Sequence, residues 1–121
     1  MRDFLYRFLV AAMLTTISQV ADAASGKFVP SMKQIATLER NIVLPEGAGH
    51  LRDYARFYAG LVLDGKQVIF VLLRSDLSKR GMEVVDADHL PVVFDGGCSV
   101  VHAVYEIESG SFKKIGCNGV A

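Results

Sequence analysis

The pair Asp64-Gly65, which lies between two apolar segments, restricts the fold of this chain more than any other feature. Such a pair is favoured in a two-residue type I′ turn, because both positions require a positive φ. Residues 67–73 after the turn are rich in β-branched side chains, which favours a strand. Residues 51–63 before it have apolar spacing that suits either a helix or a strand, and the turn decides for a strand. The sequence therefore predicts a β-hairpin.

The turn also predicts which residues of the hairpin face each other. Leu61 is expected opposite Val68, and Phe57 opposite Leu72, so that one face of the hairpin is apolar throughout. The second strand is apolar on both faces, which is typical of a strand in the interior of a sheet. The hairpin is therefore expected to be part of a larger sheet.

One helix is predicted ahead of the hairpin. Ser31 and Gln34 have the spacing of a capping box, in which the serine side chain and the Gln34 side chain each bond to the other residue's backbone. Met32 and Ile35 fall on one face, as in a surface helix that covers a core. The helix is expected to end near Asn41.

Residues 98–107 and 112–117 are predicted as two further antiparallel strands joined by a turn. Residues 90–94 suit a short strand, which Pro91 restricts to an edge of the sheet. The predicted fold class is α+β, with one N-terminal helix packed on an antiparallel meander of about four strands and stabilised by one disulfide.

Residues 1–23 have the pattern of a secretory signal peptide, with a basic start, an apolar run over residues 8–17 and small residues at Ala21 and Ala23. The predicted cut follows Ala23. The apolar run does not provide the roughly 20 consecutive apolar residues of a membrane span, although an uncleaved anchor is the alternative. The predicted location is periplasmic or secreted, with no stable membrane span after processing.

Cleavage there leaves residues 24–29 as a flexible lead and residues 30–121 as a single domain. The 13 Lys and Arg residues balance the 13 Asp and Glu residues, so charge gives no reason to expect a nucleic acid as partner. The 51% content of hydrophobic residues argues against intrinsic disorder.

Cys98 and Cys117 are the only cysteines, and an even number in an exported chain predicts one intrachain disulfide. In an ideal hairpin the two cysteines are out of register. A bend at Gly96-Gly97 or a bulge near Gly116 is therefore needed to bring them together.

The alternative for Cys98 is a thiolate–imidazolium pair with His102, as in a small thiol-dependent enzyme. Four residues of a strand span about 13 Å, which is too far for a hydrogen bond without a bend. We therefore expect the disulfide and assign no catalytic residue.

Tyr54, Arg56 and Tyr58 share one strand face and are residue types enriched at binding hot spots, so they form a candidate interaction face. The alternative is that Arg56 stacks between the two rings and binds an acidic residue.

Asp86 and Asp88 are a weak candidate for a metal site, because carboxylates in a loop can bind calcium. They lack the glycine and the closing glutamate of a known calcium loop, which favours a solvated acidic loop. No metal and no cofactor is predicted.

The segments YARFY at residues 54–58, DGGCSVV at residues 95–101 and CNG at residues 117–119 resemble a group of small secreted proteins of unknown function from Gram-negative bacteria. The resemblance covers about residues 44–121. It implies an exported location and pairing of Cys98 with Cys117, and it implies no activity.

These features favour an exported, non-catalytic domain that binds an unidentified protein or small ligand, because no nucleophile has a base within reach. A thiol-dependent enzyme using Cys98 and His102 is one alternative. An inhibitor of an envelope or secreted enzyme is the other.

Overall fold

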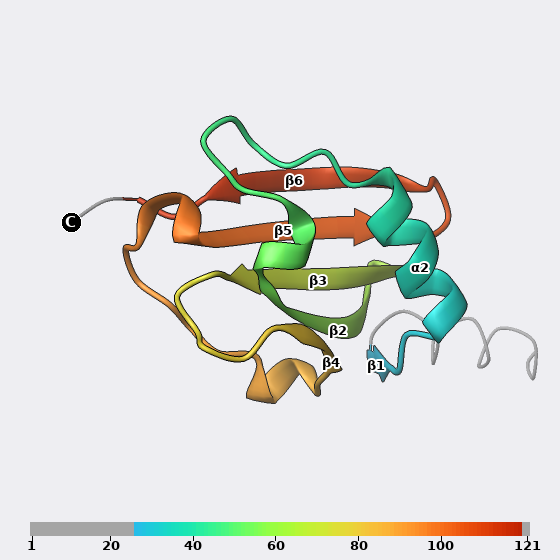
Figure 1. Ribbon diagram of the computed structural model, residues 1–121. Helices are drawn as coiled ribbons and strands as arrows, with labels where there is room; N and C mark the ends of the chain where they lie inside the picture. The colour runs from blue at the N-terminus through green and yellow to red at the C-terminus, as the bar shows by residue number, and fades with distance from the viewer. Residues whose placement is uncertain (1–25, 120–121) are drawn as a thin grey trace, which may run out of the picture.

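The computed structural model describes residues 26–119, in which one α-helix lies against a single six-stranded sheet (Figure 1). The predicted signal peptide and its cut after Ala23 lie outside the described residues. None of the helices in residues 26–119 has the length and hydrophobicity of a membrane span. The elements in chain order are β1 (Gly26–Phe28), α2 (Met32–Asn41), η1 (Leu51–Asp53), β2 (Ala55–Leu63), β3 (Lys66–Arg74), β4 (Gly81–Val84), η2 (Ala87–His89), η3 (Gly97–Ser99), β5 (Val100–Glu106) and β6 (Ser111–Cys117).

The strands run in the order β1-β2-β3-β5-β6, and β4 also pairs with β2. The β2–β4 pair is parallel and every other pair is antiparallel. β1 pairs with the second half of β2, where Phe28 is opposite Gly60. β4 pairs with the first half of β2, where Gly81 is opposite Ala55. Two short strands therefore complete one edge of the sheet.

The prediction of one helix on a four-strand meander was wrong, because the protein is mostly sheet and has six strands in one sheet. β1 lies in the predicted flexible lead, at residues 24–29, and no strand was predicted where β4 lies. Both are too short to show an alternating pattern, and they are strands because β2 offers them a partner. Residues 90–94 were predicted as a strand and pair with no strand.

The predicted hairpin is confirmed. Leu61 pairs with Val68 and Phe57 with Leu72, as the turn required. The turn residues Asp64 and Gly65 have φ values of 52° and 76°. β3 lies between β2 and β5, so it is the interior strand that its apolar faces predicted.

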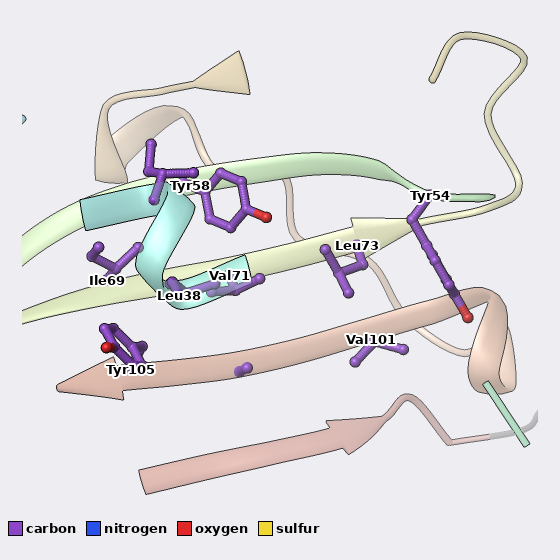
Figure 2. Packing of buried hydrophobic residues seen from close by; sticks show 10 residues of the cluster. Leu38, Tyr54, Tyr58, Ile69, Val71, Leu73, Val101 and Tyr105 are labelled. Carbon is purple, nitrogen blue, oxygen red and sulfur yellow. The ribbon is translucent and has the colours of Figure 1, made fainter. Parts of the chain in front are cut away.

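The predicted helix and its capping box are also confirmed. Ser31 accepts a hydrogen bond from the backbone of Gln34, whose side chain accepts one from the backbone of Ser31. Ile35 and Leu38 are fully buried between α2 and the sheet, where they belong to the same core as Ile69. Figure 2 shows this core, which is formed by one face of β2, β3 and β5 beneath the helix.

Residues 85–96 cross from β4 to β5 on the other face of the sheet. β4 and β5 both run parallel to β2, so the connection is of the parallel type that is almost always right-handed. Figure 2 shows this crossover behind β2 and β3, on the face of the sheet opposite α2. Ala59 and Leu72 point to that face and are only 0% and 6% exposed.

Candidate functional site

The predicted interaction face of Tyr54, Arg56 and Tyr58 is not an open surface. Tyr54 and Tyr58 are 2% and 0% exposed, because α2 and the loop after it cover them. The Tyr58 hydroxyl and Arg56 Nε both donate to Oε2 of Glu39 on α2, the latter over 2.7 Å. Tyr58 and Arg56 thus join the helix to the sheet, whereas the Tyr54 hydroxyl donates to the carbonyl of Cys98. Of the alternative for Arg56, the bond to an acidic residue is confirmed.

The surroundings of Tyr58 keep its hydroxyl protonated. Burial, together with the hydrogen bond to the Glu39 carboxylate, holds the pKa of Tyr58 well above its usual range. The phenol is therefore a permanent hydrogen-bond donor to Glu39 at physiological pH.

Asp86 and Asp88 bind a lysine rather than forming an open carboxylate pair. Lys27 Nζ on β1 donates to Asp86 over 3.0 Å and also to Asp88. The backbone N–H of Asp88 and the Lys27 ammonium lower the pKa of Asp86, while hydrogen bonds to Asp88 and Asp86 raise the pKa of Lys27. Residues 26–119 contain no cluster of three or more metal-ligating side chains. The two aspartates fasten β1 to the segment after β4.

Cys98 and Cys117 form a disulfide with a Cα–Cα distance of 4.6 Å. The predicted bend is present, because Gly96 and Gly97 have φ values of 92° and 56° and lead into η3, which carries Cys98. A bulge lies at Lys113 and not near Gly116. The Cys98 sulfur is bonded to Cys117, so the proposed thiol pair with His102 is not formed.

A side chain that the sequence did not single out, Asn118, organises the residues next to the disulfide. Its Nδ2 donates to the carbonyl of Val93 over 2.8 Å and to the carbonyl of Asp95 over 3.0 Å. Its Oδ1 lies 3.0 Å from Nδ1 of His102. Because both amide hydrogens are used by the carbonyls, the amide oxygen accepts and His102 Nδ1 carries the proton. His102 therefore fixes the orientation of Asn118.

Asn118 holds residues 91–95, which we call the presented segment. Within residues 26–119, no backbone group of this segment bonds to another backbone group. Val92 and Phe94 are 80% and 84% exposed, whereas Val93 between them is partly buried. This alternation is typical of an extended chain. The segment therefore points two large apolar side chains into solvent from a backbone that is fixed from one side.

The presented segment ends in a sharp turn that is itself tied down. Asp95 has a φ of 62°, in the left-handed region, and the turn continues through Gly96 and Gly97. The Gly97 N–H donates to the carbonyl of Gly119 over 3.2 Å. The turn, the disulfide and the Asn118 side chain thus meet at the base of the segment.

Comparison with known protein families, with curated proteins and with solved structures finds no match. The resemblance to small secreted proteins therefore stays a prediction. The candidate site is assigned from its geometry alone.

A depression of about 430 Å³ lies beside the disulfide and is lined by Tyr54, Ser75 and Ser99 among others. The Ser75 hydroxyl donates to the carbonyl of Ser99, and the Ser99 hydroxyl donates to the carbonyl of Gly96. In the part of the chain that the structure describes, no hydrogen bond joins either hydroxyl to an imidazole or a carboxylate. The geometry therefore favours the presented segment over this depression as the functional site.

Proposed function

We propose that the protein is an exported, non-catalytic interaction domain that presents Val92 and Phe94 to a protein partner. The observation that carries this proposal is the 84% exposure of Phe94 on a segment whose backbone is braced by Asn118. Burying a phenylalanine side chain in an interface contributes about 1.5–3 kcal/mol.

Bracing favours binding because it lowers the entropic cost of association. A loop that is mobile before binding loses conformational freedom when a partner holds it, and that loss reduces affinity. Two hydrogen bonds from Asn118 fix carbonyls on either side of Phe94 before any partner arrives. The side chain of Phe94 can then bind with little further ordering of the backbone.

Export is the second part of the proposal. A disulfide persists in oxidising compartments, which include the periplasm and the extracellular space. The Cys98–Cys117 bond and the leader-like composition of residues 1–23 support such a location. We place the working protein in the periplasm or outside the cell, with the presented segment open to other exported proteins.

A photo-crosslinking amino acid at position 94 tests the proposal in cells that make the protein. Position 29 is the matched control, because Val29 is comparably exposed, at 82%, and follows β1, which lies at the opposite end of the strand order from β6 and Asn118. We expect a discrete crosslinked protein from position 94 and none from position 29. The same crosslinks from both positions, or none from position 94, would contradict the proposal.

A further inference from the structure

We propose that the partner is an exported serine protease that accepts large apolar side chains, and that the presented segment occupies its substrate cleft as an inhibitor. In this arrangement Phe94 enters the pocket that receives the side chain before the scissile bond, the S1 pocket. This inference rests on the proposed function and names the class of its partner.

The free backbone groups of the segment match what a protease cleft requires. Proteases hold a substrate as an added extended strand, through hydrogen bonds to its backbone. The carbonyls of neighbouring residues in an extended chain point in opposite directions. Because the Val93 carbonyl accepts from Asn118, we expect the carbonyls of Val92 and Phe94 to point away from the scaffold. No hydrogen bond within residues 26–119 uses the backbone of Val92 or Phe94.

The hydrogen bonds that hold the segment to the scaffold lie on both sides of the residue that would enter the S1 pocket. Asn118 holds the carbonyl before Phe94 and the carbonyl after it, and leaves Phe94 itself unbound. Rigid presentation of this kind is how small inhibitors reach high affinity over interfaces of ordinary size. The disulfide joins Cys98, four positions after Phe94, to Cys117, the neighbour of Asn118. The residue that fills the pocket is therefore flanked by fixed points.

The turn after Phe94 explains why the segment is an inhibitor and not a substrate. A protease also binds the residues after the scissile bond, and Asp95 with its φ of 62° departs there from an extended chain. Phe94 can therefore fill the S1 pocket while the Phe94–Asp95 peptide bond stays out of line for attack. The bond remains intact, and the complex is non-covalent.

Inhibition assays with the oxidised protein test this inference. Chymotrypsin and subtilisin accept large apolar residues in the S1 pocket, and trypsin, which requires arginine or lysine, is the contrast. We expect competitive inhibition of chymotrypsin or subtilisin and none of trypsin. Truncation in Phe94→Ala should raise the inhibition constant about 100-fold, as for a central hot-spot residue. The control Val29→Ala should leave it unchanged.

A change of specificity gives a second measurement that does not depend on the affinity for one enzyme. Phe94→Arg should stop inhibiting chymotrypsin and start inhibiting trypsin, whose S1 pocket carries an aspartate. Inhibition of neither apolar-selective enzyme at 100 µM would overturn the inference, as would equal inhibition by the parent and Phe94→Ala. Crosslinking from position 94 separates the two proposals, because a crosslink without protease inhibition leaves the proposed function standing and removes only the protease.

Discussion

The Nδ1 atom of His102 on β5 lies 3.0 Å from Oδ1 of Asn118, the residue that follows β6. This contact aims the Asn118 amide at the carbonyls of Val93 and Asp95. A histidine that suggested a catalytic pair in the sequence thus acts as a support for the presented segment. The neighbouring Cys98–Cys117 disulfide supports the same end of the presented segment.

Removal of the Asn118 amide should release the presented segment without unfolding the domain. In Asn118→Ala the two carbonyls lose their donor, and the chain at Asp95 can then straighten into the extended form that a protease cuts. We expect chymotrypsin to cleave after Phe94 at least about ten times faster than in the parent, because two hydrogen bonds contribute roughly 1–3 kcal/mol.

Mass spectrometry of the fragments measures this cleavage. Asn41→Ala, at the end of α2, is the matched control and should behave as the parent does. Equal cleavage of Asn118→Ala and the parent would show that Asn118 does not brace the segment.

The sequence predicted elements whose signals are local. The Asp64-Gly65 turn sets the register of β2 and β3, and Ser31 with Gln34 sets the start of α2. The Cys98–Cys117 pair needed only an even count and an oxidising compartment. Each of these features could be predicted from residues close in sequence or, for the disulfide, from the number of cysteines.

The remaining elements depend on contacts between distant parts of the chain. Residues 90–94 have the composition of a strand, yet β1 and β4 already occupy the free edge of β2, and Pro91 removes a donor. Tyr58 has the composition of a binding residue and is buried because α2 lies over it. Asn118 carries no signal of its own, since its acceptors lie 25 and 23 residues away in sequence.

The hydrogen bond from Tyr58 to Glu39 predicts how stability changes at high pH. The folded state holds the pKa of Tyr58 above its usual range, so this phenol keeps its proton while the unfolded chain loses it above about pH 10. Its contribution to the free energy of unfolding is therefore complete below that pH and falls as the pH rises further. Unfolding by urea at a series of alkaline pH values measures the decline.

The variant Tyr58→Phe isolates this contribution. It should be about 1–3 kcal/mol less stable at neutral pH, because it loses a hydrogen bond to a carboxylate. Its stability should then fall less steeply than that of the parent above pH 10. Tyr105→Phe is the control, since it leaves the bond to Glu39 in place. Parallel pH profiles for the parent and Tyr58→Phe would argue against this role.

Gly60 is the position at which β1 can approach β2. A Cβ atom there would lie 2.3 Å from the carbonyl oxygen of Phe28 and 2.9 Å from its ring, so β1 would have to move. We predict that Gly60→Ala costs about 1–3 kcal/mol of stability, as overpacking does. Urea unfolding measures the loss. Gly119→Ala, where a Cβ meets nothing within 4 Å, should be neutral, and an equally neutral Gly60→Ala would mean that β1 is not held there.

Loss of the disulfide should affect both the stability of the domain and the order of the presented segment. The bond joins residues 19 positions apart, and closing a loop of that size stabilises a protein by about 3 kcal/mol. The double variant Cys98→Ser, Cys117→Ser should lose roughly that amount in urea unfolding. Because Asn118 follows Cys117 directly, chymotrypsin should also cleave faster after Phe94. Reductant should lower the stability of the parent and speed its cleavage to the values of the double variant, and should leave the double variant unchanged. A drop in stability without faster cleavage would show that the disulfide does not help to brace the segment.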